Sequence, residues 1–161
     1  MEDLLAFAED APRRVLDPGE VLLVDGEPVN ALYVLIDGGL RIDKAGTRIA
    51  NVTEPGACVG EMSLLLGIPA TADVTASGRS AVAVVQDAAR MLETDSGLSL
   101  ALARLLAARL QTMTTYLADI SRQYADHEGG LGMVDIVLEN LMSGSGARGR
   151  LGSERDPDPE Y

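Results

Sequence analysis

Between Val15 and Val85 the chain repeats one pattern, in which a short apolar run is followed by a turn signal. The turn signals are Asp17-Pro18-Gly19, Asp25-Gly26, Asp37-Gly38-Gly39, Lys44-Ala45-Gly46 and Glu54-Pro55-Gly56. The runs between them are Val21–Val24, Ala31–Ile36, Leu40–Ile42 and Arg48–Val52. Apolar runs this short, spaced by roughly 8–12 residues and separated by Gly-rich turns, predict the strands of a β-sandwich or β-barrel.

Two further segments complete this expected β-domain. Residues 73–86, DVTASGRSAVAVVQ, are predicted to form two strands that pair with each other through a turn at Ser77-Gly78. The first ten residues, MEDLLAFAED, predict an amphipathic helical turn. Its Leu4, Leu5 and Phe7 would face the body of the domain.

The periodicity changes at about Leu98, after which no Gly or Pro occurs for 30 residues. Apolar residues recur there at steps of 4, 3, 4, 3 and 4, namely Leu106, Leu110, Met113, Leu117, Ile120 and Tyr124. That alternation is typical of a coiled-coil seam, and a helix of this length, about 40 Å, is longer than a small barrel. The stripe could pack on its own barrel, but its spacing favours a helix that pairs with its twin in a homodimer.

The organisation of the chain follows from these segments. We expect one domain over residues 1–128, which includes the long helix at 98–128 and ends before Gly129-Gly130. A short amphipathic helix is expected within 129–142. Residues 143–161 are rich in Gly, Ser, Pro and mixed charges, the composition of a disordered tail.

Composition excludes several classes of function. A net charge of −12 and a pI of about 4.3 disfavour binding to nucleic acid, because phosphates are held mainly by clustered Lys and Arg. No run approaches the ~18 apolar residues of a membrane span. The acidic N-terminus does not resemble a signal peptide. Cys58 is the single cysteine, which indicates a reducing cytoplasm, and it is expected to be a small buried residue.

The side-chain inventory also disfavours metal binding and catalysis. His127 is the single histidine, so a barrel metal site with several histidines cannot be assembled. The same residue would have to serve any Ser-His or Cys-His pair, and it lies far along the chain from the β-region. No spacing singles out a catalytic carboxylate pair among the 25 acidic residues. We therefore expect a protein that is not an enzyme.

One stretch, residues 60–74 with the sequence GEMSLLLGIPATADV, has the outline of an anion-binding turn without any Lys or Arg. Met62–Leu66 can form a helical turn whose free N–H groups favour an anion. Glu61 can accept hydrogen bonds from sugar hydroxyls, and Ser63 and Thr71 can donate them. The alternative is a connecting loop in which Leu64–Leu66 plug one end of the barrel.

From Arg13 to Asp126 the chain resembles the cyclic-nucleotide-binding domain shared by bacterial catabolite activators, kinase regulatory subunits and gated channels. Three motifs carry the resemblance: PGEVLLVDGEPVNALYVLIDGGLRI, GEMSLLLGIPATADVTA and AARLQTMTTYL. The resemblance implies a mainly β protein, with a jelly-roll-like β-roll, flanking helices and a long C-terminal helix. It also implies that the stretch beginning at Gly60 is a phosphate-binding cassette, with cAMP or cGMP as the ligand.

The resemblance further implies roles for single residues. Glu61 matches the glutamate that binds the ribose 2′-hydroxyl, and Gly60, Met62 and Ser63 match backbone positions near the phosphate and ribose. Thr71 matches a small or hydroxyl-bearing residue at the phosphate. Ala70 stands where the family has the arginine that pairs with the phosphate. More loosely, Met113 and Thr114 match positions on the long helix that contact the base.

The departure at Ala70 leaves three outcomes open: weak binding of a cyclic nucleotide, binding of a less anionic ligand, or no binding. The residues after Gly130 contain no apparent recognition helix, so we do not expect a transcription factor. The leading hypothesis is a stand-alone cytoplasmic regulatory module, dimeric through its long helix, that acts on an unknown protein partner. The alternative is a dimeric interaction or scaffold protein with a degenerate pocket.

Overall fold

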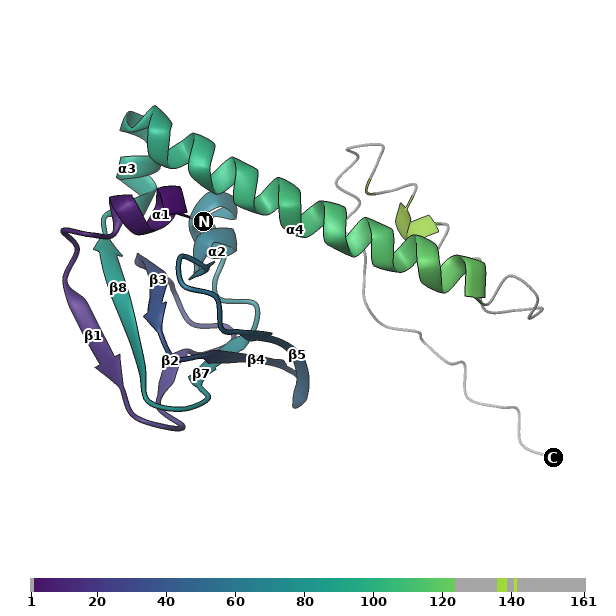
Figure 1. The fold of residues 1–161 in the computed structure, drawn as a ribbon, viewed down its shortest axis with the longest axis horizontal. Helices are drawn as coiled ribbons and strands as arrows, with labels where there is room; N and C mark the ends of the chain where they lie inside the picture. The colour runs from purple at the N-terminus through teal and green to yellow at the C-terminus, as the bar shows by residue number, and fades with distance from the viewer. Residues whose placement is uncertain (1, 124–135, 139–140, 142–161) are drawn as a thin grey trace, which may run out of the picture. The chain divides into compact units, whose positions relative to one another are not determined.

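The computed structural model describes residues 2–123, 136–138 and 141. Contacts divide the chain into two units, Met1–Ala107 and Ala108–Tyr161, which we describe separately. Along the chain (Figure 1), the helices and strands are α1 (Glu2–Phe7), β1 (Arg13–Leu16), β2 (Val21–Leu23), β3 (Ala31–Asp37), β4 (Leu40–Lys44), β5 (Thr47–Val52), β6 (Cys58–Val59), α2 (Glu61–Leu66), β7 (Asp73–Ala76), β8 (Ser80–Gln86), α3 (Ala88–Thr94) and α4 (Ser96–Gln123).

The first unit contains two antiparallel four-stranded sheets, ordered β1-β8-β3-β6 and β2-β7-β4-β5. The expected fold class, a mainly β roll with flanking helices and a long helix, is confirmed. Most expected strands are present within one or two residues of their predicted ends. Cys58 is buried as expected.

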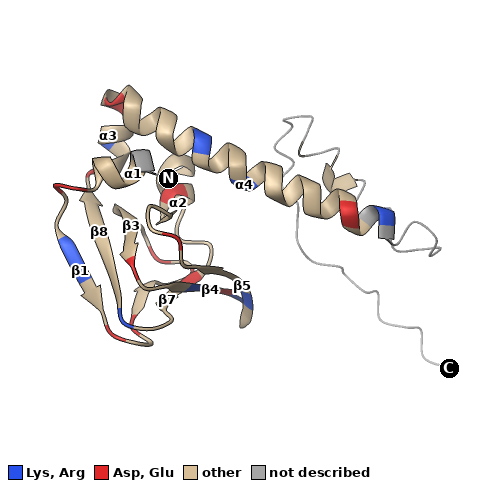
Figure 2. Ribbon diagram, viewed as in Figure 1, with Lys and Arg blue, Asp and Glu red and all other residues tan. Residues whose placement is uncertain are grey.

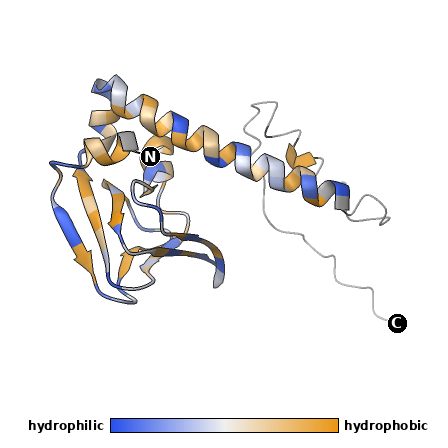
Figure 3. Cartoon of the chain, in the orientation of Figure 1, coloured by the Kyte–Doolittle hydropathy of each residue, from blue (hydrophilic) through white to orange (hydrophobic). Residues whose placement is uncertain are grey.

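The alternation of side chains along β3 builds two cores. Leu32 and Val34 face the helices, where they join residues of α1, α3, β8 and the start of α4. Tyr33 and Leu35 face the other way, into a core shared by strands of both sheets. Both faces of a central strand are therefore apolar, which agrees with the hydrophobic colouring of β3 and β8 (Figure 3).

The predicted pairing of the last two strands is wrong. β7 and β8 exist, but β7 pairs with β2 and β4, whereas β8 pairs with β1 and β3 in the other sheet. The buried Ser80 hydroxyl lies where the chain crosses between the sheets. It donates to the carbonyl of Gly39, and it accepts from the Gly39 N–H at 3.0 Å. The Ser77-Gly78 turn signal correctly predicted where β7 ends, but it did not predict which strands β7 and β8 pair with.

Three elements of the first unit were not predicted from the sequence, namely the strand β1, the short strand β6 and the helix α3. Directly after α3, the Asp95 carboxylate accepts hydrogen bonds from the N–H groups of Gly97 and Leu98. That cap explains why α4 begins at Ser96, two residues before the predicted start.

The second unit is described over the rest of α4, to Gln123, and at residues 136–138 and 141, which are helical. Leu110 and Met113 of the predicted seam are 45% and 62% exposed, and Leu117 and Ile120 are half-buried. Leu106, in the first unit, is also half-buried. Tyr124, His127, the predicted helix end at Gly129-Gly130, most of 129–142 and the tail at 143–161 lie outside the described residues. No helix in the described part of the chain has the length and apolarity needed to cross a membrane.

Candidate ligand-binding site

The segment predicted to bind a ligand contains α2, a helix of six residues bounded by two left-handed glycines. Gly60 has φ 92° and Gly67 has φ 63°. A Cβ at Gly60 would lie 3.0 Å from the Ala31 carbonyl oxygen and 3.2 Å from Val29 Cγ1. Gly60 is therefore required both by its backbone conformation and by the close approach of the neighbouring chain.

The burial pattern of α2 is the reverse of an ordinary amphipathic helix. Its polar residues Glu61 and Ser63 are only 5% and 6% exposed, whereas Leu65 and Leu66 are 48% and 64% exposed. The interpretation of Leu64–Leu66 as a plug for the barrel is therefore wrong. Leu64 alone packs beside the helix-side core. Both buried polar side chains are compatible with the fold, because no buried side-chain nitrogen or oxygen in the described part of the chain lacks a hydrogen-bond partner.

Hydrogen bonds fix the residues that follow α2. The Ser63 hydroxyl donates to the Pro69 carbonyl at 3.2 Å. The Ala70 N–H donates to the Glu27 carbonyl, and the Gly26 N–H donates to the Ala70 carbonyl, both at 2.8 Å. Both backbone polar groups of Ala70 are thus paired with the turn between β2 and β3.

Asp73 is fixed to the same turn. Its carboxylate oxygen Oδ1 accepts a hydrogen bond of 2.8 Å from the Asp25 N–H. In the structure the carboxylate is held by the turn, where it reinforces the two hydrogen bonds at Ala70.

Ala70, which is 5% exposed, lies in the wall of a cavity of about 270 Å³. The other described lining residues come from β2, the turn after it and the start of β3: Val21, Leu22, Leu23, Val24, Glu27, Pro28, Val29, Asn30 and Tyr33. Sequence reasoning missed these residues. The signal available was the Asp25-Gly26 turn, but a turn signal does not reveal that the turn bonds to a segment more than 40 residues away.

The charged residues of α2 and of the described cavity wall, Glu61 and Glu27, are acidic. Figure 2 shows acidic colouring but no Lys or Arg on α2. None of the described residues that line the cavity is a Lys or Arg either. Where the chain is described, no group of three or more His, Cys, Asp or Glu side chains could hold a metal ion.

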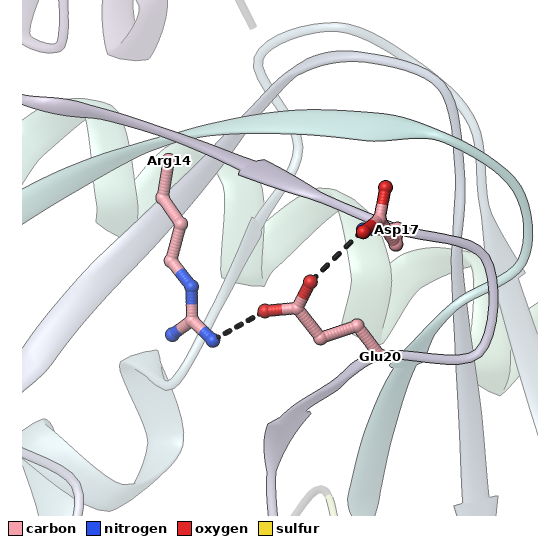
Figure 4. A network of polar contacts seen from close by, with 3 residues as sticks. All are labelled: Arg14, Asp17 and Glu20. Atoms are coloured by element: carbon pink, nitrogen blue, oxygen red, sulfur yellow. Dashed lines mark hydrogen bonds and ion pairs between the residues drawn. The ribbon is translucent and has the colours of Figure 1, made fainter.

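A separate polar network holds the turn that leads into β2 (Figure 4). The Arg14 guanidinium contacts Glu20 Oε1 at 2.7 Å, and the Asp17 N–H donates to Glu20 Oε2 at 2.9 Å. The hydrogen bond from Arg14, and then that from the backbone of Asp17, lower the pKa of Glu20. This network fixes the start of the strand whose residues line the cavity.

The six predicted cassette residues fall into two neighbouring groups. Gly60, Glu61, Met62 and Ser63 form the start of α2, and Ala70 and Thr71 follow its end, linked back by the bond from Ser63 to Pro69. The predicted base contacts, Met113 and Thr114, belong to the second unit. Their role, like the ligand contacts of the six, stays a prediction.

A family model described as "Cyclic nucleotide-binding domain" matches residues 13–93, about half of the chain. The chain belongs to the cyclic nucleotide-binding domain family. The match extends from the first residue of β1 into α3 and includes the whole of the predicted cassette. The resemblance inferred from the sequence is therefore confirmed.

Several solved structures share the fold of this chain. The catabolite activator protein of Thermus thermophilus matches with a TM-score of 0.60 and 24% identity, over 74% of this chain and 59% of its own. The sensor domain of the transcriptional regulator DNR from Pseudomonas aeruginosa matches with a TM-score of 0.52 and 27% identity, over 67% and 78%. The regulatory subunit of a cAMP-independent protein kinase A from Trypanosoma brucei matches with a TM-score of 0.56 and 21% identity, over 66% and 38%. The chain thus spans less than two thirds of the first of these proteins.

Proposed function

We propose that the chain is a non-enzymatic regulatory module that senses a small ligand and binds cyclic nucleotides only weakly. Membership of the cyclic nucleotide-binding domain family supports a ligand-sensing role. Glu61 and Gly60 lie at the start of α2 within the stretch that the family model covers, which supports a functional rather than a merely connecting segment. The observation that carries the weak binding is the environment of Ala70, whose side chain has no charge and whose N–H is bonded to Glu27.

The size of the expected weakening follows from hydrogen-bond energetics. A hydrogen bond between an arginine and a phosphate contributes about 1.5–3 kcal/mol. Loss of that bond should weaken binding about tenfold to more than a hundredfold. The remaining candidates for holding the ligand are Glu61, for a ribose hydroxyl, and Thr71.

Calorimetric titration with cAMP and cGMP at millimolar concentration tests this proposal. We expect weak binding by the natural sequence and a gain of about tenfold or more in cAMP affinity for Ala70→Arg, because the new guanidinium would pair with the phosphate. The matched control is Ala72→Arg, which adds the same charge two residues further on. Absence of binding by the natural sequence and by Ala70→Arg, with both proteins folded, would contradict the proposal that the site binds cyclic nucleotides.

The second candidate is a dimeric interaction protein that no longer binds a ligand. It is favoured by the exposure of Leu110 and Met113 on the predicted seam. We propose a homodimer through α4 for both candidates, with a protein rather than a nucleic acid as the further partner. Glu61→Ala discriminates between them, because it should abolish ligand response in a sensor and leave partner binding by a scaffold unchanged.

A further inference from the structure

The cavity beside Ala70 has a mostly apolar wall that also carries three polar side chains. Among its described lining residues Glu27 is the single carboxylate, and Asn30 and Tyr33 add an amide and a phenol. These groups can accept hydrogen bonds from hydroxyl and amino donors. The remaining lining residues are apolar. A volume of about 270 Å³ is close to the lower end of the range of ligand pockets, so it suits a small ligand.

Two valines in the wall are unusually accessible. Val21 is 48% exposed and Val24 is 40% exposed, although both belong to the segment that forms β2 and its end. An apolar ring that packed on them would remove this surface from water, which is favourable. The wall therefore combines a surface for a ring with acceptors for polar donors.

None of the described residues in this wall is a Lys or Arg that could pair with a phosphate. Ala70 stands where the resemblance places the phosphate-binding arginine, so its N–H is a candidate donor to a phosphate. That N–H already donates to the Glu27 carbonyl at 2.8 Å. The Ser63 hydroxyl donates to Pro69. A phosphate placed here would lie beside Glu27, whose carboxylate would repel it, although Glu27 is exposed and solvent screens part of that repulsion.

We propose that this cavity binds an uncharged ligand that joins a flat ring to hydroxyl or amino donors, the chemistry of a ribonucleoside, and that it discriminates against the phosphorylated form. The ring packs on Val21 and Val24, and the donors bond to Glu27, Asn30 and Tyr33. This inference rests on the proposed sensing function and specifies its ligand class. Under this proposal Ala70 helps the site to select an uncharged ligand, in addition to removing the arginine that would pair with a phosphate.

Titration of the full chain with adenosine, guanosine, cAMP and cGMP tests the proposal. We expect at least one nucleoside to bind about tenfold or more tightly than its cyclic monophosphate. Glu27→Gln should narrow that difference by improving binding of the cyclic monophosphate, since it removes the repelling charge. Equal or tighter binding of the cyclic monophosphate by the natural sequence would overturn the inference but leave the sensor function intact.

A pair of valine variants tests the location. Val24→Trp should fill the cavity from its accessible wall and weaken nucleoside binding about tenfold or more. Val15→Trp is the matched control, because Val15 is 56% exposed on β1 and does not line the cavity. If both variants fold and bind the nucleoside equally well, the cavity is not the site. If neither nucleosides nor cyclic nucleotides bind at millimolar concentration, the proposed function and this inference both fail.

Discussion

At the scale of single residues, Gly60 shows how local backbone geometry and close packing act together at the start of α2. Many glycines of this chain have positive φ, and most have open space around them. Gly46, for example, has φ 76° and no heavy atom within 4 Å of the place where a Cβ would lie, whereas at Gly60 the nearest atom lies at 3.0 Å. A side chain at Gly46 would meet only the cost of the left-handed conformation, whereas a side chain at Gly60 would also meet neighbouring atoms.

We expect Gly60→Ala to destabilise the fold more than Gly46→Ala. Both variants place a side chain in the left-handed region, at a cost of about 1–2 kcal/mol. Gly60→Ala must also displace the chain at Ala31 and Val29, which adds about 1–3 kcal/mol. Denaturant unfolding of the two variants measures the difference, and equal losses of stability would show that the close approach has no energetic consequence.

Glu20 provides a prediction for pH. Because Arg14 and the Asp17 N–H lower the pKa of Glu20 in the folded state, Glu20 stabilises the fold above its unfolded pKa. That contribution is lost as the pH falls through the folded pKa. An NMR titration of the Glu20 carboxyl carbon should give a midpoint below the ordinary value for glutamate. Arg14→Ala should move it back towards that value, and an unchanged midpoint would contradict the role of the ion pair.

The candidate site shows which features can be read from sequence at this scale. The Gly60-Glu61 start and the missing arginine at Ala70 are positions in one continuous motif, so they were visible from the sequence. The cavity was not, because it depends on hydrogen bonds between Ala70 and Glu27 and between Asp73 and Asp25, residues far apart along the chain. Likewise the short apolar runs predicted strands, whereas the pairing of β7 and β8 depends on tertiary contacts.

At the scale of elements, the crossing between β7 and β8 depends on one buried hydroxyl. Ser80 is 2% exposed; its hydroxyl accepts from the Gly39 N–H, and its single proton is within donating distance of the carbonyls of Gly39 and Gly78. These bonds join the connection between β7 and β8 to the turn between β3 and β4. Both connections cross from one sheet to the other, and the hydrogen bonds of Ser80 therefore tie the two crossings together.

We expect Ser80→Ala to lower the free energy of unfolding by about 1–3 kcal/mol, because it leaves a buried N–H without its acceptor. Ser77→Ala is the control, since Ser77 is exposed in the same connection. Chemical denaturation of both variants provides the measurement. A loss of stability no greater for Ser80→Ala than for Ser77→Ala would show that the hydroxyl does not hold the crossing.

At the scale of the whole molecule, the apolar surface of α4 bears on assembly. Apolar residues recur along α4, visible as repeated hydrophobic segments in Figure 3, and several of them are exposed in the single chain. The spacing of the predicted seam matches that of a coiled coil. A partner helix would remove this surface from water.

We expect Leu110→Glu to convert a dimer into a monomer at tens of micromolar in sedimentation experiments, because it places a charge in the apolar seam. Leu100→Glu is the matched control, since Leu100 is 52% exposed on the same helix but does not belong to the seam. A monomeric natural protein at this concentration, or equal effects of the two variants, would contradict the proposed interface.

The placement of β8 also has a consequence for biosynthesis. β8 is an inner strand of its sheet, bonded to β1 on one side and β3 on the other, although it is the last of the described strands along the chain. A nascent chain that has not yet emerged beyond Gln86 therefore lacks the strand that joins β1 to β3. Because domains generally fold as units and non-local pairings form slowly, the first sheet cannot be completed before the residues up to Gln86 have emerged. Until then its apolar strands must be kept from aggregating.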